Sequence, residues 1–268
     1  MYGSQYNNER GILYIRISQS NIQIMPYRRL PNTDLARLRA IEAGLELGKR
    51  TAVTKLAFSQ QTLEKLQVFY PNLLGSIRQL NISKQNQFDR SKEYGEIFRK
   101  ARLYLSHFLQ VVNFAIAREE MKPEAIEFYG LKMNAKATPP LNLEAHVLIW
   151  GEKIIDGEQK RVMKGGSAIY SPSIALVKVH YEEFKEAYRQ QKQLQNITNL
   201  ASVRVAELRE KADELIQQMW NEVENSMLHL SDDEKREEAS KYGIVYVYRV
   251  SEQKKMEVES IQQSLLFS

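Results

Sequence analysis

One long stretch without helix breakers limits the possible folds more than any other feature. From Ser173 to Met227 the chain contains neither proline nor glycine. Apolar residues recur there at intervals of three and four, the spacing of an amphipathic helix. A helix over 172–228 would be about 80 Å long at about 1.5 Å per residue. Its apolar positions are Ile174, Val177, Tyr181, Phe184, Tyr188, Ala201, Val205, Leu208, Ala212, Leu215, Met219 and Val223.

The same spacing predicts how this helix packs. The apolar positions follow a coiled-coil-like pattern, and the pattern shifts phase near Gln191, as a stutter would do. We therefore expect at most one break in the helix, near Asn196–Ser202. Ser171 at the cap and Pro172 at the first helical position are typical of a helix start.

Shorter helices are predicted in the first half of the chain. Asn32, Thr33 and Asp34 can cap a helix that runs to about Lys49. A second helix begins after Ser59, and Pro71 should kink it or end it. A third is predicted over about 91–120, and a short turn, EAIEFYG, closes on Gly130. Asn142 can cap a fourth helix, which Gly165 and Gly166 end.

Two runs have the composition of β-strands, Ile12–Ile17 and Ile244–Val250. A lone strand cannot satisfy its own backbone groups. The two runs therefore pair with each other, pair with a neighbouring chain, or are not strands. Between the long helix and the second run, Ser231 and Glu234 have the spacing of a capping box for a short acidic helix, which Gly243 ends.

These elements predict a mostly α protein. We expect an elongated antiparallel helical bundle with one very long coiled-coil-like helix and one or two short β-strands near the termini. The predicted parts are an N-terminal strand and arm, a helical bundle, the long helix with the acidic helix and terminal strand, and a flexible tail. Their ranges are 1–31, 32–166, 167–250 and 251–268.

Composition removes several classes of function. The chain has no cysteine, which excludes a disulfide framework, a thiolate metal site and a cysteine nucleophile. No apolar run approaches the roughly 18 residues of a membrane span, and the first one, Ile12–Ile15, is too short for a signal-peptide core. We therefore expect a cytoplasmic protein without a membrane partner.

Charge is divided unevenly along the chain. Residues 1–200 hold 29 Lys and Arg against 19 Asp and Glu, whereas residues 201–268 hold 9 against 14. This division fits head-to-tail association or an acidic segment folding onto a basic body, and it equally fits chance variation on solvated faces. The basic excess is too dilute to support a nucleic-acid partner by itself.

No catalytic, cofactor or metal motif is present. The four histidines, His107, His146, His180 and His229, lack metal-ligand spacing, and we expect His107 to be an interior residue. The adjacent carboxylates on the helices do not converge on one substrate. The sequence therefore predicts no catalytic residue, no cofactor and no metal.

Two short segments could bind partners. A basic turn with two glycines precedes the long helix and could hold an anion, although bases and glycine also simply favour a helix end. Its residues are Lys160, Arg161, Lys164, Gly165, Gly166 and Ser167. The tail run Q-S-L-L-F resembles the pentapeptide by which bacterial polymerases and repair proteins dock on the sliding clamp. Gln263, Leu266 and Phe267 match it, Ser264 departs from it, and the apolar residues could instead pack on the chain's own helices.

Three further runs carry a family resemblance: Arg28–Ala40, Tyr104–Glu119 and Ala212–Glu224. They resemble segments of a family of uncharacterised bacterial helical proteins with no assigned activity. The resemblance implies one continuous helical unit and no particular chemistry.

The leading functional prediction is a non-catalytic helical binding or assembly protein that self-associates. One alternative is a DNA-replication or repair accessory protein that docks on the sliding clamp through its tail. A further alternative is a helical enzyme whose site is built from scattered residues.

Overall fold

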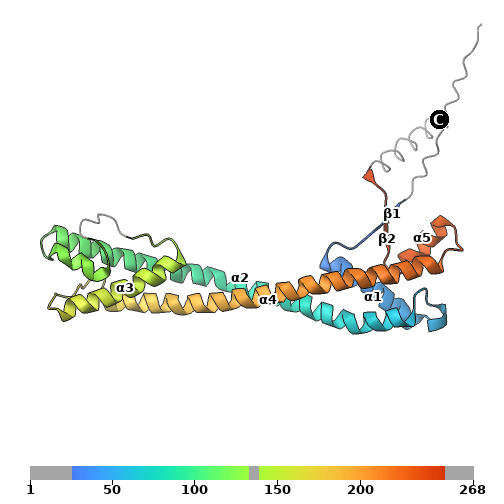
Figure 1. Ribbon diagram of the computed structural model, residues 1–268, viewed down its shortest axis with the longest axis horizontal. Coiled ribbons are helices and arrows are strands. Elements are labelled where there is room, and N and C mark those ends of the chain that lie inside the picture. Colours follow the sequence, from blue (N-terminus) through green and yellow to red (C-terminus); the bar gives the residue numbers. More distant parts are fainter. Residues whose placement is uncertain (1–25, 133–138, 251–268) are drawn as a thin grey trace, which may run out of the picture.

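Two long helices determine the shape of the protein. The computed structural model describes residues 26–132 and 139–250. Helices α2 (Gln60–Ala117) and α4 (Ile174–Ser226) run antiparallel along the whole length of the elongated molecule (Figure 1). The predicted fold class is confirmed, with two very long helices where the sequence predicted one.

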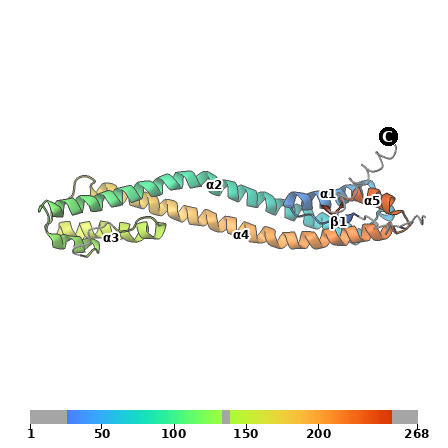
Figure 2. The same cartoon turned by 90° about the horizontal axis from the view of Figure 1, so that it is seen from above.

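The shorter elements gather at the two ends of this helical pair (Figure 2). Helix α1 (Asp34–Arg50), the 3₁₀ turn η1 (Val53–Lys55) and helix α5 (Asp232–Ser240) lie at one end. Helix α3 (Glu144–Met163) and the 3₁₀ helix η2 (Pro123–Tyr129) lie at the other. Each end therefore has at least three helices around its core.

Glycines let the third helix of each end approach closely. A Cβ atom at Gly44 of α1 would overlap the Met219 side chain of α4. At the opposite end, a Cβ atom at Gly151 of α3 would overlap the Tyr181 ring. The glycines of α1, which weaken a helix in isolation, are thus used here for packing.

Two hydrophobic cores fill the ends, and a gap separates them. The α1 core includes Ile41, Leu66, Ile216, Met219 and Trp220. The α3 core includes Leu105, Phe108, Tyr129, Ile154 and Phe184. Within the described residues, no hydrophobic side chain is fully buried in segments 81–100 of α2 and 185–204 of α4. We call these two segments the waist.

A seven-residue repeat continues through the waist without interruption. On α4 the buried positions seven apart are Val177, Phe184, Gln191, Thr198, Val205, Ala212 and Met219. On α2 the corresponding series is Leu66, Leu73, Leu80, Gln87, Tyr94, Ala101, Phe108 and Ala115. This series shows no phase shift near Gln191: polar residues occupy the repeat there, and the helix is unbroken across Asn196–Ser202.

Helix α2 is longer than the sequence predicted. It begins after the Ser59 cap, as expected, and then passes through Pro71 and Ser91 as one helix. Pro71 removes one backbone donor, but its ring is exposed. Leu66 and Leu73 are both buried on the face that meets α4, so packing on both sides of the proline keeps the helix continuous.

Two helix starts also differ from the predictions. Helix α3 is preceded by Leu143, which makes no side-chain cap, while Asn142 Oδ1 lies 3.2 Å from Nδ1 of His146. Helix α4 begins at Ile174, where Ser173 Oγ accepts from the Leu176 amide; the Ser171–Pro172 peptide is cis and lies outside the helix. The Thr33 cap and the Ser231–Glu234 capping box are confirmed.

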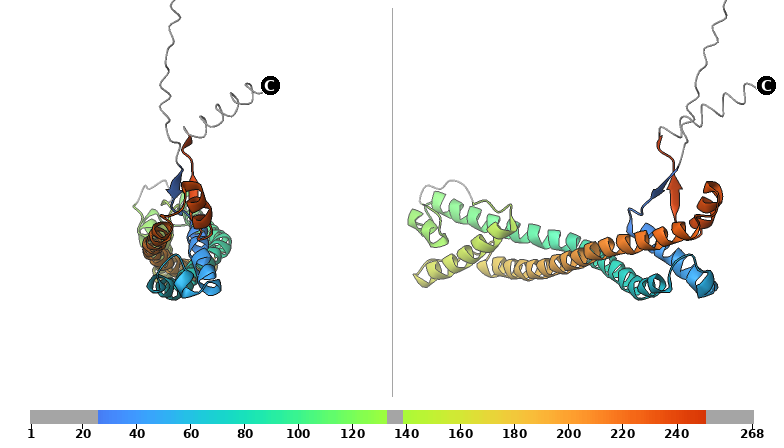
Figure 3. Two further views of the ribbon diagram at one scale, coloured as in Figure 1. Left: turned by 90° about the vertical axis from the view of Figure 1, so that its right-hand side faces the viewer. Right: turned by 45° about the vertical axis from the view of Figure 1, so that its right-hand side comes forward.

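A two-stranded ribbon projects from the α1 end (Figure 3). Strand β1 (Tyr27–Arg29) pairs antiparallel with β2 (Val245–Val247), with Arg28 opposite Tyr246. The second predicted strand is thus confirmed and pairs within the chain, but its partner is Tyr27–Arg29. The other predicted strand, Ile12–Ile17, lies outside the described residues.

Ion pairs join the N-terminal segment to the C-terminal half of α4. Arg28 Nη1 lies 2.9 Å from Glu224 Oε2, and Arg37 forms a two-bond pair with Asp213. Asp34 and Arg209 form another two-bond pair, in which the acidic residue lies in the N-terminal segment and the basic residue lies on α4. Two of these three pairs follow the charge division seen in the sequence.

Candidate interaction surface at the waist

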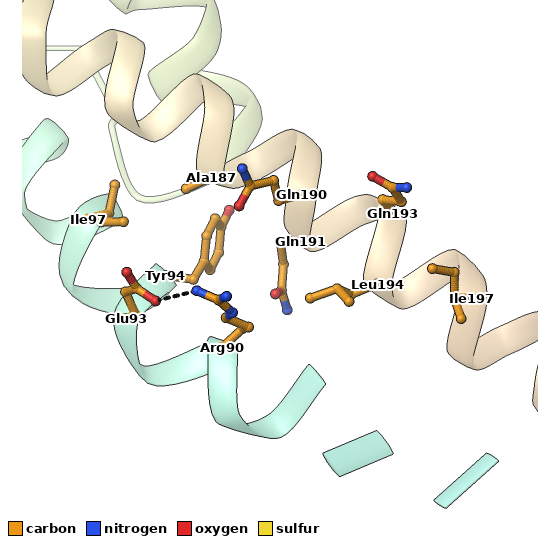
Figure 4. A pocket seen from close by; sticks show the side chains of 10 residues that line it. All are labelled: Arg90, Glu93, Tyr94, Ile97, Ala187, Gln190, Gln191, Gln193, Leu194 and Ile197. Atoms are coloured by element: carbon orange, nitrogen blue, oxygen red, sulfur yellow. Dashed lines mark hydrogen bonds and ion pairs between the residues drawn. The ribbon is translucent and has the colours of Figure 1, made fainter. Parts of the chain in front are cut away.

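An open groove lies between α2 and α4 at the waist (Figure 4). Its volume is about 320 Å³. Its apolar wall is formed by Tyr94 and Ile97 of α2 and by Ala187, Leu194 and Ile197 of α4. Its polar lining consists of Arg90, Glu93, Gln190, Gln191 and Gln193.

Tyr94 is fixed as a wall of the groove by its hydroxyl group. Tyr94 Oη donates to Glu144 Oε1 of α3 at 2.6 Å, and the other oxygen of Glu144 lies 3.2 Å from Lys192 Nζ. Burial, together with the hydrogen bond to Glu144, raises the pKa of Tyr94 well above its usual value. The phenol therefore stays neutral and acts as a donor that ties the waist to the first turn of α3.

The rim of the groove carries both signs of charge. Arg90 Nη1 lies 3.1 Å from Glu93 Oε2, and both side chains are about two-thirds exposed. Gln190 Nε2 donates to Glu186 Oε1 at 3.1 Å. Exposed pairs of this kind contribute little to stability. The rim side chains are therefore free to exchange these bonds for bonds to a partner.

Other apolar side chains of the waist are exposed outside the groove. Phe88 is 73% exposed, Leu200 64% and Val203 59%. Ile82 and the groove residue Ile197 are also exposed. At the ends of the molecule a third helix packs on α2 and α4. At the waist, Glu144 of α3 bonds to Tyr94 and Lys192, and Tyr94, Ile97 and Tyr188 pack against the edge of the α3 core. The waist therefore combines an open groove with uncovered apolar side chains.

The residues of the predicted anion-binding turn differ in their exposure to solvent. Arg161 is buried and forms a two-bond pair with Glu158, whose Oε2 also accepts from the Tyr129 hydroxyl. A further bond from Arg161 Nη2 to the Ser167 carbonyl, at 2.6 Å, holds the turn. Arg161 therefore faces the protein and is not available to an external anion.

The rest of that turn is exposed. Lys160 and Lys164 face solvent, and Lys164 Nζ lies 5.1 Å above the Phe128 ring. Gly165 has a φ of 88°, which favours glycine, and Gly166 lies against Arg161. Anion binding by these four residues stays a prediction.

The histidines and carboxylates are dispersed. His107 is exposed on α2, so the expectation of an interior histidine is wrong. The residue lies one position before the buried Phe108, on the solvent side of the helix. Within residues 26–132 and 139–250, no group of three or more His, Cys, Asp or Glu could hold a metal ion. The tail residues Gln263, Leu266 and Phe267 lie outside these ranges.

Sequence reasoning missed the groove and the buried Tyr129–Glu158–Arg161 cluster. A signal for the groove was present, because Gln191 and Thr198 stand seven residues apart between Phe184 and Val205. The cluster depends on the position of η2 beside α3, and the sequence spacing does not specify that contact.

Comparisons with known proteins do not assign this chain to a class, so the protein is described by its fold alone. No protein-family model, no curated protein and no solved structure matches the chain. No helix in the described part of the chain is long and apolar enough to cross a membrane. The protein is an elongated helical hairpin with two separate cores, and its resemblance to a bacterial helical family stays a prediction.

Proposed function

We propose that this chain is a non-catalytic helical binding or assembly protein that self-associates through its waist. The observation that carries the proposal is the set of apolar side chains that the two long helices leave exposed between the two cores. Burial of apolar surface stabilises association by about 25 cal/mol per Å² before the costs of binding. A partner that covered the waist would supply what α1 and α3 supply at the ends. We also propose a cytoplasmic location, as expected from the lack of a long apolar run in the sequence.

Light scattering tests the proposal directly. The chain has a mass of 31.2 kDa, and self-association predicts a mass at least twice that value which falls on dilution. Replacing the exposed waist residue Phe88 with Lys should shift the equilibrium towards the monomer.

Val68 provides a matched control for that substitution. It lies on the same helix, is 81% exposed and is outside the waist. Val68→Lys should leave the mass unchanged. A monomer at every concentration of the wild-type protein would contradict self-association.

The tail sequence supports a second candidate, docking on a sliding clamp. A Leu-Phe pair separated from a glutamine by two residues offers an apolar anchor and an orienting hydrogen bond to a clamp pocket. A peptide of residues 260–268 should bind a purified bacterial clamp, and Phe267→Ala in the peptide should abolish binding. Equal binding of the two peptides would contradict this candidate.

A further inference from the structure

We propose that the groove at the waist is filled by the same groove of a second copy, with the two copies related by a two-fold axis. This inference rests on the proposed self-association and specifies its contact surface. The groove contains a projecting side chain as well as a cavity: Ile197 is 42% exposed at one end, and Tyr94, Ile97 and Leu194 form the wall beside it. The same surface thus contains both the projecting apolar side chain and the apolar groove that would receive it, as a symmetric contact requires.

The charges of the rim favour a second copy over a strongly charged partner. The lining carries one positive side chain, Arg90, and one negative side chain, Glu93, one turn apart on α2. Across a two-fold axis, each cation would meet the anion of the other copy. The remaining polar residues, Gln190, Gln191 and Gln193, carry amides that can both donate and accept, so they also complement themselves.

The length of the groove fits a contact between helices. Its lining on α4 extends from Ala187 to Ile197, which is about 15 Å at about 1.5 Å per residue. Two such pairs of helices would form a short four-helix layer between the two cores. Residues near the middle of the groove, such as Gln190 on the exposed rim, would then lie close to their own counterparts across the axis.

Cross-linking tests this placement, because the chain has no cysteine of its own. Gln190→Cys should give a covalent dimer under mild oxidation or with a short bismaleimide. Gln217→Cys is the matched control: it is also exposed on α4, has Asp213 four residues before it as Gln190 has Glu186, and lies outside the waist. It should remain uncross-linked.

Charge variants separate the contact from self-association in general. Gln190→Glu and Gln190→Lys should each weaken association about tenfold by placing like charges at the axis, and an equimolar mixture of the two should restore it. The corresponding Gln217 variants should have no effect. If both Gln190 variants associate like the wild type while light scattering still shows an oligomer, the groove is not the contact and self-association stands. If the wild type is monomeric, both proposals fail.

Discussion

The two ends of the molecule and its waist use one backbone pattern with different side chains. At the ends, the seven-residue repeat of α4 places Val177, Phe184, Val205, Ala212 and Met219 in hydrophobic cores. At the waist, the same repeat places Gln191 and Thr198, with Gln87 in the corresponding series on α2. The repeat therefore sets the geometry of the helical pair, and the residue type at each position decides how strongly each region is held.

The difference has an energetic consequence. Full burial of a large apolar side chain contributes about 1.5–3 kcal/mol, whereas a typical hydrogen bond contributes about 0.5–1.5 kcal/mol net. At the waist, for example, Thr198 Oγ1 donates to the Ser83 carbonyl of α2 at 3.3 Å. Burial of apolar side chains is therefore concentrated in the two cores, and the waist contributes less of it.

The largest expected effect comes from breaking one of the cores. Leu208 is 2% exposed, and Leu208→Asp should lower the free energy of unfolding by about 4 kcal/mol because it places an unpaired charge in an apolar site. Denaturant unfolding followed by circular dichroism measures the loss. Val179→Asp, on the same helix with a 60% exposed side chain outside the waist, should change it by less than about 0.5 kcal/mol. Equal losses would contradict the assignment of Leu208 to the core.

The next effect concerns the polar cluster inside the α3 core. Glu158 is 1% exposed, and Glu158→Gln leaves the Arg161 guanidinium buried without its counter-charge. We expect a loss of about 3 kcal/mol in the free energy of unfolding. Chemical denaturation measures it, and Glu158→Asp, which keeps the charge, should lose less. If the Gln variant were as stable as the wild type, the ion pair would not hold this end.

The same cluster predicts a pH dependence. Burial alone would raise the pKa of Glu158, but hydrogen bonds from Arg161 and Tyr129 outweigh it, so the pKa is lowered from its usual value near 4.5. A lowered pKa in the folded state gives stability that is present above the unfolded pKa and is lost as pH falls through the folded pKa. The stability gap between wild type and Glu158→Gln should therefore be largest above pH 4.5 and narrow below it. A gap that widened on acidification would contradict this assignment.

A smaller effect on the free energy of unfolding is expected when a polar residue of the waist repeat is replaced by an apolar one, as found in the cores. Gln191 occupies the repeat between Phe184 and Thr198 and is 7% exposed. Gln191→Leu should raise the free energy of unfolding by about 1 kcal/mol, since it replaces a buried amide with an apolar side chain at a core position. Gln217→Leu, at an exposed position of the same helix, is the control and should be neutral. A destabilised Gln191→Leu protein would show that the amide is required there.

The sequence predicts the long-range architecture well and the local breaks less well. The absence of Pro and Gly in α4, the Thr33 and Ser59 caps and the Ser231–Glu234 box all follow from local chemistry, and the structure confirms them. Of the two outcomes predicted for Pro71, an end of the helix is wrong, because packing against α4 on both sides of the proline keeps α2 continuous. Gln191 likewise lies within an unbroken helix.

The candidate site could be predicted only in part, because the polar positions Gln191 and Thr198 are visible in the sequence but the alignment of the two helices is not. The groove requires the alignment of 90–97 with 187–197 across two antiparallel helices, and that alignment is set by the hydrophobic cores on either side of the waist. The partner of β2 was missed because Tyr27–Arg29 is short and basic. Its position depends on the Arg28–Glu224 pair and on the hydrogen bond from Tyr246 to Glu224 at 2.7 Å.

The smallest effect on stability is expected from breaking an exposed ion pair, which we compare with breaking a buried one. Arg90 and Glu93 at the rim of the groove are exposed, in contrast to the buried Arg161 and Glu158. Glu93→Gln should therefore change the free energy of unfolding by less than about 0.5 kcal/mol, measured as the unfolding midpoint in urea of the monomer at low concentration. The same variant removes the anion that would meet Arg90 of a second copy, so its association should weaken and depend less on salt. A variant with a large loss of monomer stability would mean that the rim pair holds the helices together, and the waist would then be a third structural region and not a surface left for a partner.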